Sequence, residues 1–173
     1  MGAEGVVIGI LKPDGTLNME QMQELMDAAG DMSVTLHRAF DVCADPFEAL
    51  KKSAELGVDT ILTSGQEADC FAGCWLLKKL VQLTDQSRSD SRRGTILAGA
   101  GVTSANIAEI AKKTGVRAFH MSGKRLLESG MRYRNERVHM GLGSLSEFEC
   151  YRTDEAEIRR AAEILRTLGE DGR

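Results

Sequence analysis

The stretch TILAGAGVTS, residues 95–104, decides the fold class. A short and almost continuously apolar run, Thr95–Ala98, passes through two glycines into a segment that begins a helix at Thr103-Ser104. A run of this length without polar alternation is typical of a parallel strand that is buried on both faces. The stretch therefore predicts one strand-then-helix unit of an α/β protein.

The same pairing of a strand with a helix recurs along the chain. Further strands are predicted at Val6–Leu11, Val34–Leu36, Thr60–Leu62 and Arg117–Met121. Helices are predicted from Asn18 to Gly30, from Asp45 to Gly57, around Leu76–Leu83, from Thr103-Ser104 to Gly115, and from Asp154, with Glu157 as its capping-box residue. A short helix is predicted near Arg125–Ser129, and Gln86–Gly94 is expected to be a polar loop. These strands and helices together predict five β-α units joined by right-handed crossovers.

Reactive or ligand-cradling residues follow four consecutive strands, and this favours a barrel over a doubly wound sheet. The four strand ends are His37–Asp41, Thr63–Gln66, Gly99–Gly101 and His120–Gly123. In a (β/α)8 barrel every strand ends at one central mouth, whereas a doubly wound sheet places its ligand at one switch point. A complete barrel needs eight units and about 250 residues. The 173-residue chain is therefore expected to be a single domain, 1–173, with the architecture of an incomplete TIM barrel.

Composition excludes several classes of protein. The chain carries 22 Lys and Arg against 26 Asp and Glu, and no stretch combines basic charge with aromatic residues, so no nucleic-acid partner is expected. No apolar run is long enough to span a membrane, and no secretory signal opens the chain. Four cysteines without a signal make a disulfide framework improbable. We therefore expect a cytoplasmic protein.

His37, Asp41 and His120 are the candidate catalytic residues. His37 could act as a general base or a metal ligand, and Asp41 could orient it. Alternatively, Asp41 and Arg38 form a structural ion pair that fixes the loop. His120 ends the fifth strand, so it either approaches the same axis as His37 or is a core histidine that bonds to a neighbour.

The candidate anion-binding residues lie mostly at the same strand ends: Arg38, Ser64, Gly65, Gly99, Gly101, Ser122, Gly123 and Arg134. Small residues before the start of a helix resemble a phosphate cradle, in which backbone N–H groups bind the anion. The two guanidinium groups could clamp a carboxylate or a phosphate. The alternatives are that the glycines only ease a tight turn and that Arg134 is a solvated surface residue.

Cys70 and Cys74 are spaced four apart in a predicted helix and therefore share one face. Two soft sulfur ligands at this spacing could hold Cu(I). The alternative is that both are small residues on a packed helix face.

Taken in order, these motifs closely resemble the CutC copper-homeostasis family. The segments that carry the resemblance are Gly9–Gly15, His37–Asp41, Leu62–Gly65, Gly99–Val102, Phe119-His120 with Ser122, and Met131–Arg134. The resemblance implies a cytoplasmic TIM-type barrel linked to copper handling, with Cu(I) as its ion. It implies no catalytic mechanism. Three β-α units and the cysteines of the first two strands of family members have no counterpart here, while Cys43 follows the HRAFD stretch, where some members also carry Cys.

Three functions remain open. The first is a CutC-type protein that holds copper as Cu(I) through soft ligands. The second is a barrel enzyme that acts on a small anionic or phosphorylated metabolite, with the glycine cradle and Arg38 or Arg134 as its anion-binding groups. The third is a truncated, inactive barrel, whose unpaired strand edges predict self-association into a homo-oligomer.

Overall fold

The computed structural model describes residues 2–87, 94–135, 137–138, 146 and 148–170. Its centre is a five-stranded parallel sheet with the order β1-β2-β3-β4-β5. The strands are β1 (Gly5–Ile8), β2 (Ser33–Leu36), β3 (Thr60–Thr63), β4 (Thr95–Ala98) and β5 (Ala118–Phe119). All five predicted strands are present. The run predicted over Val6–Leu11 ends at Ile8, and Leu11 instead forms an isolated bridge with Leu17.

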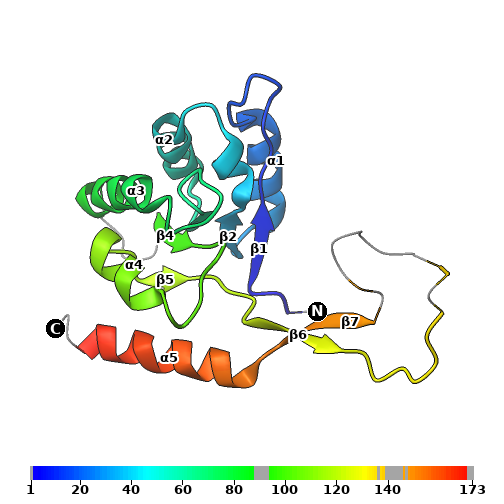
Figure 1. Cartoon of the computed structure of the whole chain (residues 1–173). Coiled ribbons are helices and arrows are strands. Elements are labelled where there is room, and N and C mark those ends of the chain that lie inside the picture. The colour runs from blue at the N-terminus through cyan, green and yellow to red at the C-terminus, as the bar shows by residue number, and fades with distance from the viewer. Residues whose placement is uncertain (1, 88–93, 136, 139–145, 147, 171–173) are drawn as a thin grey trace.

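Each strand of the sheet precedes a helix, so the five predicted β-α units are confirmed (Figure 1). The helices are α1 (Met19–Ala29), α2 (Pro46–Leu56), α3 (Cys74–Ser87), α4 (Ile107–Thr114) and α5 (Glu155–Glu170), with a short 3-10 turn, η1 (Arg38–Val42), after β2. Local sequence sets the predicted helix ends. The Asp45 carboxylate accepts hydrogen bonds from the first N–H groups of α2, and Gly57 ends this helix with a left-handed φ of 82°.

One face of the sheet is buried beneath α1–α4 and the other is open. Val34, Ile61 and Ile96 point into the helical layer and are buried there. The alternate positions point to the opposite face because side chains of a strand alternate between faces. Val7 on this face is 63% exposed, and Leu62 pairs with Leu97 beside it.

The sheet is also open at both edges. Among the described residues, β1 pairs only with β2 and β5 pairs only with β4. A closed barrel would pair its first strand with its last. The structure is therefore an α/β fold of five parallel β-α units, consistent with part of a TIM-like barrel.

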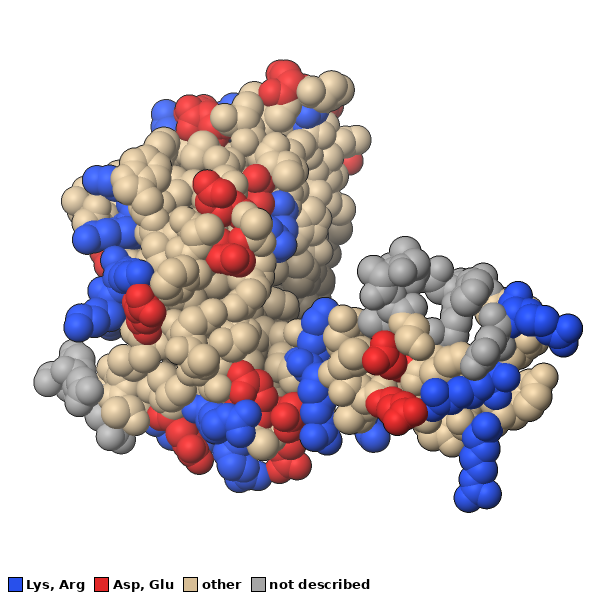
Figure 2. All heavy atoms as spheres, viewed as in Figure 1, with Lys and Arg blue, Asp and Glu red and all other residues tan. Residues whose placement is uncertain are grey.

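A two-stranded antiparallel hairpin separates β5 from α5 and projects from the body (Figure 1). Its strands are β6 (Lys124–Glu128) and β7 (Glu149–Thr153). The helix predicted near Arg125–Ser129 is therefore wrong, because the segment gains its hydrogen bonds from a strand more than twenty residues further on. Lys and Arg side chains lie over this hairpin and where it joins the body (Figure 2). Of the predicted loop at Gln86–Gly94, Gln86 and Ser87 belong to α3, and residues 88–93 lie outside the described residues.

Candidate functional site

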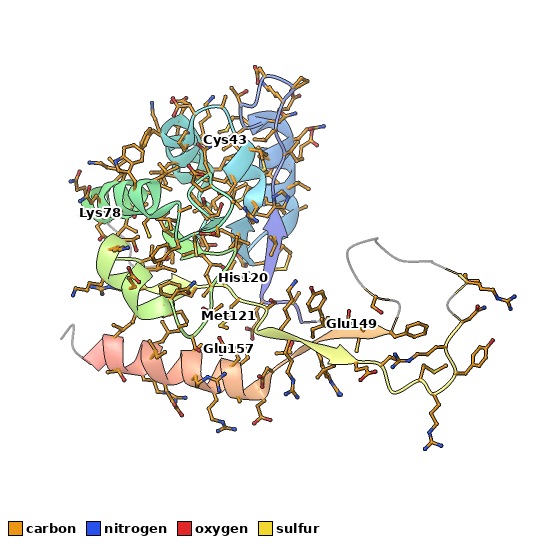
Figure 3. The ribbon with its side chains drawn as sticks, in the orientation of Figure 1. Cys43, Lys78, His120, Met121, Glu149 and Glu157 are labelled. Carbon is orange, nitrogen blue, oxygen red and sulfur yellow. The ribbon has the colours of Figure 1, made fainter. Side chains whose placement is uncertain are left out.

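A cleft of about 620 Å³ lies at the carboxyl end of the sheet, between the strand ends, the base of the hairpin and the start of α5. Parallel strands bring their carboxyl ends to the same edge, so residues far apart in sequence meet there. The lining residues are Arg38, Leu62, Ala100, Gly101, Val102, Thr103, His120, Met121, Ser122, Gly123, Lys124, Arg125, Asp154 and Glu157. Figure 3 places His120, Met121 and Glu157 between the sheet and α5. The predicted convergence of strand ends therefore forms a real cleft.

Arg38 reaches this cleft with its guanidinium group held in place. Its Nε donates to the Asp41 carboxylate over 2.6 Å, and its Nη2 donates to the Ser64 hydroxyl over 3.0 Å. These bonds use two of the five guanidinium N–H groups. Among the described residues the other N–H groups have no hydrogen-bond partner. Arg38 is therefore oriented by its neighbours and still able to bind an anion.

Asp41 joins η1 to the loop after β3. Its carboxylate accepts hydrogen bonds from the Thr63 hydroxyl over 2.5 Å and from the backbone N–H groups of Ser64 and Gln66. Burial raises the pKa of Asp41, but these bonds and the Arg38 contact together hold the pKa below its ordinary value of 3.8. The structural ion pair of Arg38 and Asp41 is thus present. No hydrogen bond in the described part of the chain joins Asp41 to His37.

The two histidines occupy different surroundings. His37 Nδ1 accepts from the Ala39 N–H over 3.0 Å, and its ring packs on Gly9, where an added Cβ would lie 2.6 Å from Cε1. His37 does not line the cleft. His120 does line it and is exposed, with its backbone N–H bound to the carbonyl of Ala98. His120 therefore faces the cleft, and the structure does not bring His37 to the cleft with it.

The glycine-rich loop after β4 adopts a left-handed conformation at Ala100 and Gly101, with φ values of 73° and 72°. This turn leads to the start of α4, where the predicted phosphate cradle lies. An anionic side chain of the chain itself occupies the position. The Glu157 carboxylate accepts from the Ser104 N–H over 2.6 Å and from the Ser104 hydroxyl over 2.8 Å.

Glu157 was not among the predicted site residues. Sequence patterns place it in the capping box of its own helix, whereas its carboxylate bonds to Ser104 and to Arg160. Hydrogen bonds from Ser104 lower the pKa of Glu157 below its ordinary value of 4.5. Asp154 begins α5 as predicted, and its carboxylate accepts a hydrogen bond from the Ala156 N–H. The contact spans 53 positions, so no local signal in the sequence reveals it.

The remaining predicted anion-binding residues divide between the cleft and other places. Ser122 and Gly123 line the cleft, where they follow β5. Ser64 and Gly65 are buried beside it, and the Ser64 hydroxyl donates to the carbonyl of Glu67. Gly99 is buried, and an added Cβ there would lie 2.6 Å from Leu62 Cδ1. Arg134 follows β6 and does not line the cleft, since it pairs with Glu128 and covers the ring of Phe148.

The predicted thiol ligands are free cysteines. Cys74 is the first residue of α3, but the helix predicted for Cys70 is wrong, since Cys70 lies in the turn before α3 and donates its N–H to the carbonyl of Ala100. The Cys74 thiol lies 3.5 Å from the carbonyl oxygen of Cys70. Burial raises the pKa of Cys70 to about 11 and also raises the pKa values of Cys43 and Cys74.

No larger set of metal ligands is present in the described part of the chain, where no three His, Cys, Asp or Glu side chains group together. Cys43 is buried, and the Gln66 amide donates to its carbonyl oxygen and contacts its sulfur. No metal site is therefore shown among the described residues, and Cys43, Cys70 and Cys74 stay predicted ligands. Among the described residues no helix is long and apolar enough to cross a membrane.

The sequence of the chain matches a known family. A profile described as the CutC family covers residues 1–125. A relative named family protein CutC, from Bacteroides fragilis, is 47% identical over 166 residues, which are 95% of this chain and 64% of that protein. A relative of the same name from Salmonella agona is 40% identical over the same shares of the two chains. The chain thus spans less than two thirds of the length of these relatives.

A solved structure is similar as well. A CutC protein from Streptococcus agalactiae, described as a copper homeostasis protein, superimposes with a TM-score of 0.60 and 27% sequence identity. The match covers 68% of this chain and 55% of the other. The likeness supports the part-barrel interpretation of the five β-α units.

Proposed function

Because the chain belongs to the CutC family, we propose that it acts in cytoplasmic copper homeostasis as part of a (β/α)8-type barrel. The family match over residues 1–125, together with 47% identity to a CutC relative, carries this proposal. The ion to be handled is Cu(I), which cytosolic reductants maintain and thiolates bind.

The thiols of Cys70 and Cys74 are the proposed Cu(I) ligands. The two residues flank one turn before and at the start of α3, and the Cys74 thiol lies 3.5 Å from the carbonyl oxygen of Cys70. Both pKa values are raised by burial, so binding must release protons and the apparent affinity should increase with pH.

A chelator competition measures this binding. The full chain is titrated with Cu(I) against a colorimetric Cu(I) chelator, alongside Cys74→Ser and the control Cys150→Ser. Cys150 is an exposed cysteine on β7. We expect Cys74→Ser to lose copper and Cys150→Ser to keep it. Equal uptake by both variants contradicts the assignment, and no uptake by the unaltered chain contradicts Cu(I) handling by this chain.

A second function is supported by the cleft itself, namely binding of a small anionic, phosphorylated metabolite. The supporting observation is the oriented guanidinium of Arg38, which faces the cleft with N–H groups left to bind an anion. Bidentate recognition of this kind is typical of Arg with phosphate or carboxylate. His120 lines the same cleft and is exposed, so it is the histidine placed to exchange a proton with a bound ligand.

Thermal unfolding with a panel of small phosphorylated metabolites tests this second function. A ligand at one hundred times its Kd stabilises the folded state by about 2.7 kcal/mol, which raises the Tm of a domain of this size by about 5–10 °C. We expect Arg38→Gln to lose most of the shift, and Arg166→Gln, an exposed arginine on α5, to retain it. A panel without any shift, or a shift that survives Arg38→Gln, contradicts this function.

A further inference from the structure

The register of the hairpin places two arginines directly opposite each other. Arg125 on β6 pairs with Arg152 on β7, and Glu128 pairs with Glu149 three positions further along. Directly opposed side chains in an antiparallel pair have Cβ atoms about 4.5–5.5 Å apart, and like charges at this separation destabilise the pair. The hairpin therefore contains one opposed cation pair and one opposed anion pair.

The anion pair has a counter-charge, whereas no carboxylate among the described residues pairs with either arginine of the cation pair. Arg134 donates to the Glu128 carboxylate over 2.5 Å and so offsets the repulsion between Glu128 and Glu149. Within the described residues, neither Arg125 nor Arg152 forms an ion pair. Both are exposed.

The carboxylates near the base of the hairpin are engaged elsewhere. Asp154 caps α5, Glu155 pairs with Arg159, and Glu157 bonds to Ser104 and Arg160. The neighbouring Lys124 points to the opposite face of the hairpin, where its ammonium lies 4.2 Å from the centre of the Tyr151 ring. Figure 2 shows Lys and Arg side chains gathered where the hairpin joins the body.

We propose that Arg125 and Arg152 together bind a doubly charged oxyanion of the phosphate class at the mouth of the cleft. Two guanidinium groups at directly opposed positions can both donate forked N–H bonds to one anion, and a dianion offsets the repulsion between them better than a monoanion does. Because Arg125 also lines the cleft, the pair deepens the second proposed function by giving its ligand a phosphate position separate from Arg38.

Because Arg125 and Arg152 repel each other, replacing either one should raise the unfolding temperature without phosphate and weaken the binding of phosphate when it is added. The full chain, Arg125→Gln, Arg152→Gln and the control Arg166→Gln are compared in phosphate-free buffer. Each variant of the pair should unfold about 1–3 °C above the unaltered chain, because like-charge repulsion is removed. Arg166 lies on α5, outside the hairpin. Arg166→Gln removes one positive charge, as the variants of the pair do, but it relieves no repulsion in the hairpin, so it should not gain stability.

The same proteins are then titrated with inorganic phosphate at constant ionic strength, with chloride as the balancing salt. The unaltered chain and Arg166→Gln should be stabilised by phosphate, and each variant of the pair should bind it at least about fivefold more weakly. Phosphate affinities that are equal in all four proteins overturn the proposal. So does stabilisation by chloride of the same size, since general screening then explains it.

Arg38→Gln separates this proposal from the second proposed function. If Arg38→Gln leaves phosphate binding intact while the two variants of the pair lose it, the Arg125–Arg152 site stands and the Arg38 site fails. If only Arg38→Gln loses phosphate, the proposed pair is wrong and the second function survives.

Discussion

Replacing Asp41 by asparagine should destabilise the chain by about 2–3 kcal/mol. The Asp41 side chain is 6% exposed, so its partners cannot simply exchange it for water. Asparagine keeps the shape and one acceptor oxygen but removes the charge. The hydrogen bonds from the Thr63 hydroxyl and the Ser64 N–H then weaken from charged to neutral, by about 1 kcal/mol each. The half-exposed Arg38 contact adds about 0.5–1 kcal/mol.

Urea unfolding at neutral pH measures this loss, with Asp45→Asn as the matched control. Asp45 is the exposed N-cap of α2, and asparagine serves as an N-cap about as well as aspartate. The control should therefore unfold near the unaltered chain, while Asp41→Asn unfolds at lower urea and melts about 4–12 °C lower. Equal midpoints for the two variants refute the role given to the Asp41 carboxylate.

The difference in unfolding free energy between the unaltered chain and Asp41→Asn should depend on pH, and this dependence is an independent check. The pKa of Asp41 is lowered in the folded state from 3.8, so the stability linked to its charge is fully present above the unfolded pKa. This stability is lost as the pH falls through the folded pKa. The difference between the unaltered chain and Asp41→Asn should therefore be constant above about pH 5 and shrink below pH 4. A difference that persists unchanged into acid contradicts the assignment to the carboxylate charge.

Three further outcomes are expected. Glu157→Gln weakens the hydrogen bonds that tie α5 to the start of α4, so the amides of α5 should exchange hydrogen about tenfold faster; unchanged exchange contradicts this tie. Gly9→Ala places a Cβ 2.6–2.7 Å from the His37 ring and should lower stability to urea by about 1–3 kcal/mol. In the native chain the exposed Cys150 should react quickly with a thiol reagent at pH 7.5, whereas Cys70, buried and with a pKa of about 11, should react only after unfolding.

The five β-α units could be predicted because their signals are local. The apolar runs of β2, β3 and β4 and the caps of α2 at Asp45 and Gly57 depend on neighbours within a few residues. Parallel strands then bring all strand ends to one edge, and this topological rule placed Arg38, His120 and Ser122 at the cleft in advance.

Two sequence predictions failed because the residues concerned bind partners that are distant in the sequence. The residues near Arg125 have a helix-compatible composition, but pairing with residues near Arg152 makes them a strand. The Glu157 carboxylate follows the pattern of a capping box, but a donor 53 positions away binds it. Propensity and capping patterns describe a segment by itself, so they fail where a contact across the fold provides the larger stabilisation.

The pairing of β6 with β7 and the contact of Glu157 with Ser104 also determine which groups the cleft presents to a ligand. The strand ends provide Arg38 and the glycine turn at Gly101, which lie within the family-matched residues 1–125. The opposite wall comes from the hairpin and from α5, which contributes Glu157. Since Glu157 already bonds to Ser104 before the start of α4, an incoming anion depends on other groups that line the cleft, among them the guanidinium groups of Arg38 and Arg125. Selectivity among anions should therefore depend on Arg38 and on the Arg125–Arg152 pair, and little on the glycine turn.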